Sequence, residues 1–402
     1  MKTAWLATLL FALTASAVTF YADLTGSGAR PPTKGGANPP PYTAPAQHAP
    51  RVEAVFVLDT TGSMGGLIQT AKEKIWSIAT SMASAQPAPH IRLGLVAYRD
   101  RGDTYVTRVT DLTSDLDSLY ATLMDYRAEG GGDGPESVNA ALAAAFEQIS
   151  WSSDPGTYRV VYLVGDAPPH MDYQDEARYP EILAQARDRG IVVNTIRCGD
   201  DPNTERAWRE IAAFTQGDYF TVGAAGSGVA IATPFDAELS SLSAALDGTR
   251  LFFGDAETLV VAAAKLAATD KLHAEASEAS RARRAAFNVS ESGTANAFGD
   301  HDLVAGVVSG RVKLQDLDEA ALPPAVQHLA PVEREMYLRR QADERTRLQQ
   351  RIRELSKKRD VYLAEQADAR DDLSSSLDYQ LFDSLRAQAA AKGLSYPQAP
   401  KL

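Results

Sequence analysis

Residues 54–66, AVFVLDTTGSMGG, join an apolar run to a loop rich in glycine and hydroxyl residues. The run Val55–Leu58 has no polar face, which is typical of a buried strand in a parallel sheet covered by helices on both faces. Asp59, Thr61 and Ser63 follow it with a spacing of two. Ligands of open α/β sheets bind just beyond the carboxyl ends of the strands. The stretch therefore predicts a strand followed by hard oxygen donors of the kind that Mg²⁺ prefers.

The same loop has three other interpretations. A phosphate-binding loop would need a lysine after its second glycine, and this loop has none. A nucleophile elbow needs glycines two residues before and two residues after its serine, and Thr61 stands at the first of these places. The remaining interpretation is a polar strand-to-helix turn with Ser63 or Thr61 as the helix N-cap.

Composition limits the classes of function. The chain of 402 residues is 45% hydrophobic, which is enough for a sizeable core and for two or three domains. Its net charge of −12 argues against nucleic acid as a general partner. The single cysteine, Cys198, excludes an internal disulfide.

The amino terminus predicts export. Lys2 precedes an apolar run over residues 4–13, and residues 15–17 read Ala-Ser-Ala, a small-x-small cleavage sequence. The apolar character continues beyond it, so residues 1–23 are either a signal peptide or an uncleaved inner-membrane anchor. Everything downstream would then lie outside the cytoplasm, in a bacterial periplasm or cell envelope. Residues 24–50, rich in proline and glycine, predict a tether without a core.

Strands and helices alternate from residue 51 to about residue 248. The expected strands cover residues 55–58, 91–98, 105–110, 160–164, 191–197 and 218–222, and the expected helices cover residues 67–84, 112–126, 135–149, 176–189, 203–215 and 234–246. Repeated strand–helix units of this size predict an α/β fold, a doubly wound and mostly parallel sheet. Residues 51–248 are therefore assigned to one domain.

The region that follows carries weaker signals. Residues 249–330 predict a mixed, mostly helical companion region. Within it, Thr258–Ala268 is a strongly apolar helix that we expect to pack against the α/β domain or the companion region. Leu303–Val308 is compatible with a short strand.

A long charged helix is predicted over Pro331–Asp372. We expect it to pack on its own domain or to form a helical hairpin with residues 373–391, rather than a long coiled coil. The region 331–402 contains no recognisable catalytic cluster. These patterns predict that the α/β domain is followed by a mainly helical C-terminal region.

Three acids are expected at one edge of the sheet. Asp59 and Asp166 each follow a core strand, and Asp133 lies in a glycine-rich loop before a helix whose first position is Pro135. None of these three loops contains Lys or Arg. Acids converging beside hydroxyl groups would repel one another unless a cation bound between them.

Four ordered motifs resemble a von Willebrand factor type A (VWA) domain with a metal-ion-dependent adhesion site (MIDAS). Asp59-x-Thr61-x-Ser63 is similar to the Asp-x-Ser/Thr-x-Ser signature of that site, and Asp166 resembles its distal aspartate. The longer set is similar to the subgroup found in hemicentin-type and alpha-kinase-associated proteins; it comprises DTTGSM (59–64), YRD (98–100), GGDGPE (131–136) and DAPPH (166–170). The resemblance covers about half of the chain.

One departure from the family concerns the middle loop. The family supplies a threonine there, whereas this chain offers acids. We assign Asp133 to that place, with Glu136 or Ser137 as alternatives.

The resemblance implies a Mg²⁺ or Mn²⁺ ion, with one position kept for an acidic side chain of a protein partner. The implied ligands are Asp59, Thr61 and Ser63, with Asp133 and Asp166 bound directly or through water. Candidates for the rim of the site, or for groups that support its ligands, are Glu136, Ser137, Arg99, Asp100 and His170.

The sequence thus predicts an exported cell-envelope protein that binds or adheres to a protein partner through a cation and is not an enzyme. One alternative is a metal-dependent hydrolase or phosphatase built on the same acids. The three loops, however, offer no basic residue to hold a phosphate. Another alternative is a structural scaffold that acts through its C-terminal helices.

Overall fold

The computed structural model describes residues 49–132, 134–222, 232–368 and 376–396. The predicted leader over residues 1–23, nearly all of the predicted tether and Asp133 lie outside these residues. The described residues lie within one compact unit.

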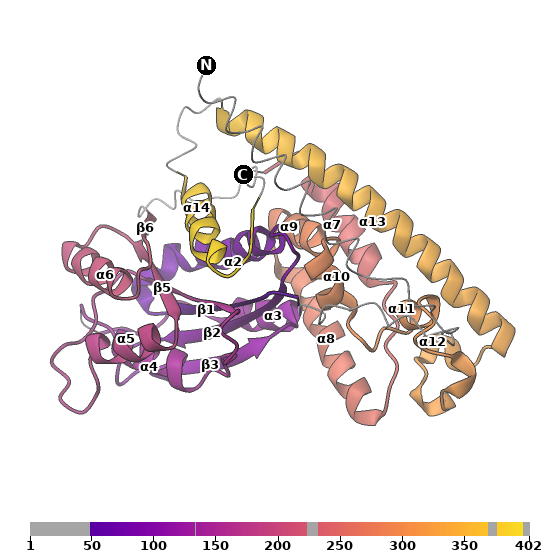
Figure 1. Cartoon of the computed structure of the whole chain (residues 1–402), viewed down its shortest axis with the longest axis horizontal. Helices are drawn as coiled ribbons and strands as arrows, with labels where there is room; N and C mark the ends of the chain where they lie inside the picture. The colour runs from indigo at the N-terminus through magenta and orange to yellow at the C-terminus, as the bar shows by residue number, and fades with distance from the viewer. Residues whose placement is uncertain (1–48, 133, 223–231, 369–375, 397–402) are drawn as a thin grey trace, which may run out of the picture. The chain divides into compact units, whose positions relative to one another are not determined.

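A six-stranded sheet of order β3-β2-β1-β4-β5-β6 forms the core (Figure 1). The strands are β1 (Arg51–Asp59), β2 (His90–Tyr98), β3 (Thr107–Thr113), β4 (Tyr158–Gly165), β5 (Ile191–Cys198) and β6 (Tyr219–Val222). All neighbours are parallel except β3, which pairs antiparallel with β2 at the edge. The predicted doubly wound, mostly parallel sheet is confirmed. Chain order reverses between β1 and β4, where such sheets bind ligands.

Both faces of the sheet are covered because alternate side chains of β1 enter two different cores. Ala54, Phe56 and Leu58 pack into the core shared with α2 and α3, whereas Val55 and Val57 pack into the core shared with α4, α5 and α6. The helices of this domain are α2 (Ile68–Ala83), α3 (Leu116–Asp125), α4 (Val138–Glu147), α5 (Tyr179–Asp188) and α6 (Pro202–Phe214). A run buried on both faces therefore makes β1 a central strand, as its continuous apolar pattern predicts.

Helices follow the sheet through the rest of the described chain. They are α7 (Asp236–Asp247), α8 (Ala256–Glu275), α9 (Glu278–Asn288), α10 (Glu291–Phe298), α11 (Leu303–Val308), α12 (Pro324–Gln327), α13 (Pro331–Asp368) and α14 (Leu377–Ala390). The predicted helical C-terminal region is confirmed. None of the described helices is both long and apolar enough to cross a membrane.

Two expectations for this region need correction. The strand expected at Leu303–Val308 is wrong, because this segment is α11; Asp302 caps it by accepting a hydrogen bond from the backbone N–H of Ala305 at 2.7 Å. The apolar part of α8 was expected to be packed, yet Val260 and Val261 are 70% and 64% exposed. Only the C-terminal half of α8 contributes fully buried residues.

The last helix, α14, packs on the α/β domain, beside α2 and β6 (Figure 1). Leu381 and Phe382 join the core on that face of the sheet. Lys74 of α2 donates a hydrogen bond to Asp378 of α14 at 2.7 Å. The domain is thus completed by residues from the far end of the chain.

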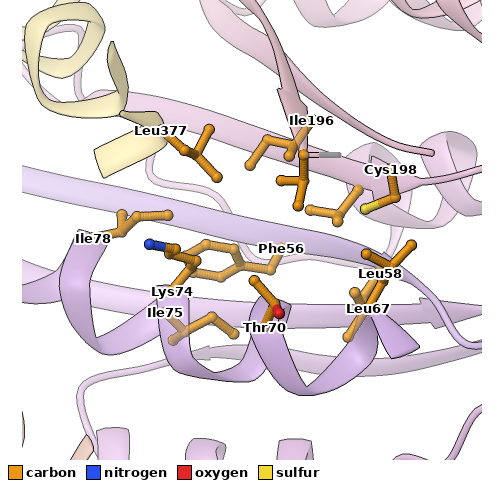
Figure 2. Close-up of a pocket in the computed structure, with 12 residues that line it drawn as sticks. Phe56, Leu58, Leu67, Thr70, Lys74, Ile75, Ile78, Ile196, Cys198 and Leu377 are labelled. Atoms are coloured by element: carbon orange, nitrogen blue, oxygen red, sulfur yellow. The ribbon is translucent and has the colours of Figure 1, made fainter. Parts of the chain in front are cut away.

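A small cavity lies beneath α14, between α2 and the sheet (Figure 2). Its volume is about 30 Å³, and its lining is mostly apolar, including Phe56, Cys198 and Leu377. A cavity of this size holds about one water molecule, and an apolar lining gives that water no partners. We therefore regard it as a packing void and not as a ligand site.

A buried network of charges joins α3 to the C-terminal helices; we call it the arginine network (Asp117, Asp247, Arg250 and Arg284). Arg284 of α9 donates to Asp117 of α3 at 2.7 Å and to Asp247 of α7 at 2.6 Å. Arg250 lies 2.8 Å from Asp247. Each acid therefore has an arginine partner inside the protein.

Candidate functional site

The loop after β1 presents its polar side chains at the carboxyl end of the sheet. β1 ends at Asp59, and a 3-10 turn over Gly62–Gly66 leads into α2. The N–H of Thr60 still bonds the carbonyl of Tyr98 at 2.9 Å, and the N–H of Gly62 bonds the carbonyl of Gly130 at 3.0 Å. The loop is thereby held between β2 and the segment before α4.

Four predicted residues come together there; we call them the donor cluster (Asp59, Thr61, Ser63 and Asp166). The Thr61 hydroxyl donates to Oδ1 of Asp59 at 2.6 Å and lies 3.1 Å from the Ser63 hydroxyl. The Ser63 hydroxyl donates to Oδ1 of Asp166 at 2.9 Å. Asp166 reaches the cluster because it follows β4, the parallel neighbour of β1.

Asp59 is fully buried with one carboxylate oxygen unused. Its Oδ2 has no hydrogen-bond partner. The end of β4 approaches closely, since a Cβ on Gly165 would lie 3.1 Å from this oxygen and 2.3 Å from the Tyr98 hydroxyl. Burial, with a smaller contribution from the charge of Asp166, raises the pKa of Asp59 to about 7. Burial also raises the pKa of Asp166.

The middle loop contributes Glu136, which is 3% exposed. Its Oε1 and the Cβ of Thr61 are each 3.3 Å from the position that a Cβ on Gly131 would take. Its Oε2 has no hydrogen-bond partner. Burial, followed by the charges of Asp59 and Asp100, raises the pKa of Glu136 to about 9. Glu136 therefore adds a third carboxyl group, buried like that of Asp59, beside the donor cluster.

Ser137, the other described alternative for the middle loop, is engaged elsewhere. Its hydroxyl donates to Oδ1 of Asp100 at 2.8 Å. Asp100 also accepts from the Tyr173 hydroxyl, at 3.2 Å for each oxygen, and lies 3.4 Å from Nε2 of His170. Sequence reasoning missed Tyr173; the only signal for it is its position three residues after the DAPPH motif.

Arg99 lies at the rim without neutralising the donor cluster. Its guanidinium donates to the backbone carbonyls of Thr60 and Arg127 at 3.2 and 2.9 Å, and lies 3.5 Å from the Glu129 carboxylate. Among the described residues, no ion pair joins a basic side chain to Asp59, Asp166 or Glu136.

The donors fit a small divalent cation. Carboxylate and hydroxyl oxygens are the ligands that Mg²⁺ and Mn²⁺ prefer, and a buried oxygen without a partner costs free energy that a cation would recover. The described part of the chain contains no group of three or more His, Cys, Asp or Glu side chains arranged around one point. The candidate ligands are therefore two carboxylates and two hydroxyls, with Glu136 as a neighbouring charge.

The fold and the site together define a class of protein: a mostly parallel α/β domain whose donor cluster lies where the chain order of the strands reverses, between β1 and β4. Residues 53–234 match the family model described as von Willebrand factor A domain. This part of the chain, which carries the whole sheet, is a VWA domain.

Two curated relatives share short segments with the chain. The von Willebrand factor A domain-containing protein 7 of Rattus norvegicus is 36% identical over 114 residues, which are 28% of this chain and 12% of that protein. Hemicentin-2 of Mus musculus is 28% identical over 166 residues, which are 41% of this chain and 3% of that protein. The chain thus spans only a small share of the length of these relatives.

Among solved structures, proximal thread matrix protein 1 from the mussel byssus, with a zinc-occupied MIDAS motif, is similar to part of the chain. The TM-score is 0.35 at 16% sequence identity, and the match covers 43% of this chain and 42% of that chain.

Proposed function

We propose that the VWA domain binds a protein partner through a divalent cation, Mg²⁺ or Mn²⁺, held by Asp59, Thr61, Ser63 and Asp166. The observation that carries the proposal is the fully buried Oδ2 of Asp59, which has no hydrogen-bond partner; among the described residues, no basic side chain is paired with this carboxylate. When bound, the cation supplies positive charge and one exchangeable position for an oxygen donor of the partner.

The electrostatics of the site support a cation. Carboxylates buried near one another without a counter-charge disfavour their ionised forms, and the raised pKa values of Asp59 and Glu136 express this cost. A divalent cation would reverse this preference for the protonated forms, because it favours the ionised carboxylates around it. In the proposal Asp59 and Asp166 hold the cation, and Glu136 contributes its charge.

The class of the domain supports a protein as the partner. VWA domains typically mediate protein–protein interactions. Met171, next to His170 in the loop after β4, is 39% exposed. An exposed methionine is common in protein interfaces. We further propose that the protein acts outside the cytoplasm, at the cell envelope, on the basis of the apolar residues 4–22.

Titration of the full chain with Mg²⁺ and Mn²⁺ in a calorimeter tests the cation. We expect one equivalent to bind to the wild type and no binding to Asp59→Ala. The matched control is Asp200→Ala, because Asp200 is an exposed acid in the loop after β5, the strand next to β4. The proposal fails if the folded wild type binds no cation, or if Asp59→Ala binds it as well as the control does.

A further inference from the structure

Asp100, two residues beyond β2, gathers hydrogen-bond donors from two other segments. The Ser137 hydroxyl, at the start of α4, donates to it at 2.8 Å, and the Tyr173 hydroxyl, in the loop after β4, donates to both of its oxygens at 3.2 Å. Nε2 of His170 lies 3.4 Å from the same carboxylate. Asp100 is 6% exposed, so its contacts lie inside the protein and tie three loops together.

The same segments hold the backbone of Glu136 on both sides. The N–H of Glu136 donates to the carbonyl of Pro168 at 2.9 Å, and the N–H of His170 donates to the carbonyl of Glu136 at 3.1 Å. Glu136 and Pro169 thus form a short parallel bridge. The next residue, Ser137, is fixed by Asp100. The backbone position from which the Glu136 carboxyl group extends is therefore set by the loop after β4.

The Tyr173 hydroxyl is aimed at Asp100 by contacts of the tyrosine ring. The ring stacks on His170 with centroids 4.1 Å apart and an angle of 15° between the planes. The guanidinium of Arg101 lies 3.9 Å from the ring centroid and bonds Asp175 at 2.8 Å. Removing only the hydroxyl would leave these ring contacts in place, which makes Tyr173→Phe a narrow probe.

We propose that Asp100, Ser137 and Tyr173 form a positioning clamp that sets the distance of the Glu136 carboxylate from the donor cluster and thereby sets the affinity for the cation. This inference rests on the proposed function. The clamp residues act through Glu136 and do not bind the cation themselves. Groups that hold metal-site residues in place typically change metal affinity by about 10–100-fold when they are removed.

Mn²⁺ titrations of the full chain, with free Mn²⁺ followed by electron paramagnetic resonance, test the clamp. We expect the double variant Ser137→Ala/Tyr173→Phe to bind Mn²⁺ at least about tenfold more weakly than the wild type. The matched control is Tyr179→Phe, which removes another hydroxyl-to-carboxylate bond, the 2.6 Å bond to Glu210, away from the site. This control should bind Mn²⁺ as the wild type does.

A double-mutant cycle with Glu136→Gln separates positioning from a purely structural role. If the clamp acts through Glu136, removing the two hydroxyls should not weaken Mn²⁺ binding further in the Glu136→Gln background. The clamp is refuted by wild-type affinity in the double variant, by a lower melting temperature with unchanged affinity, or by an equal loss in both backgrounds. A wild type that binds no Mn²⁺ would instead refute the proposed function, and the clamp with it.

Discussion

The donor cluster and the arginine network each contain a buried aspartate, Asp59 and Asp117, and the electrostatics of the two are opposite. Burial alone would raise the pKa of Asp117, but the Arg284 guanidinium, and then that of Arg250, holds it below its ordinary range. The pKa of Asp59 is instead raised to about 7 by burial and, to a smaller extent, by the charge of Asp166, and among the described residues no basic side chain is paired with it. The contrast teaches that burial does not decide the role of an acid; the presence or absence of an internal counter-charge does.

The two regions therefore serve different purposes in the fold. The arginine network joins α3 to α7 and α9, and its charges are satisfied by the chain itself. The donor cluster lies at the carboxyl ends of β1 and β4, and no ion pair among the described residues neutralises its charge.

The largest effect is expected from breaking the arginine network. Arg284→Met leaves Asp117 and Asp247 partly unpaired inside the protein, which should lower the free energy of unfolding by about 3–5 kcal/mol. Urea denaturation measures this change. The matched control is Arg351→Met, because Arg351 and Glu238 form an exposed ion pair at 2.6 Å that is worth at most about 1 kcal/mol. Equal losses in the two variants would refute the structural role of the network.

Neutralising one acid in each region should have effects of opposite sign. Without metal at about pH 8, Asp59→Asn removes an unpaired buried charge and should stabilise the chain by about 1 kcal/mol. Asp117→Asn should destabilise it, because Arg284 loses half of its compensation. The melting temperatures of the two variants and the wild type, measured in the presence of a chelator, show whether each substitution stabilises or destabilises the chain. Destabilisation by Asp59→Asn would contradict the assignment of an uncompensated charge to the donor cluster.

The pH dependence of stability should separate the two regions more finely. The pKa values of Asp59 and Glu136 are raised from 3.8 and 4.5 to about 7 and about 9. Between these values the folded, metal-free chain binds more protons than the unfolded chain, so its stability should fall as the pH rises from about 4 to about 9.

The lowered pKa values of Asp117 and Asp247 act in the opposite direction. Their contribution is complete above the ordinary aspartate pKa of 3.8 and is lost as the pH falls below it. Urea midpoints across the pH range, with chelator and with Mg²⁺, measure both slopes. Mg²⁺ should flatten only the fall in stability between about pH 4 and about pH 9. If this fall is the same with Mg²⁺ and with chelator, the result would count against cation binding at the donor cluster.

The sequence predicts the sheet and most of the donor cluster because both depend on local patterns. The apolar run at β1 and the two-residue spacing of Asp59, Thr61 and Ser63 are visible in one stretch. The placement of Asp166 needs only the assumption that β4 is the neighbour of β1, which the structure confirms.

The remaining features depend on contacts between distant segments. Asp100 accepts a hydrogen bond from the Ser137 hydroxyl, and Tyr173 reaches Asp100 only through the path of its loop. For the short run at Leu303–Val308, periodicity alone does not separate strand from helix, and the Asp302 cap decides for the helix. Nothing local in α14 shows that it packs beside α2.

The central claim, that a cation binds at the donor cluster and ionises the buried carboxyl groups of Asp59 and Glu136, is tested most directly by proton release. Calorimetric titration of the full chain with Mg²⁺ near pH 7, repeated in buffers of different ionisation enthalpy, gives the number of protons released per cation bound. The account predicts release of about one proton or more, because Asp59 and Glu136 must ionise as the cation binds. Binding without proton release, or no binding to the folded chain, would contradict it.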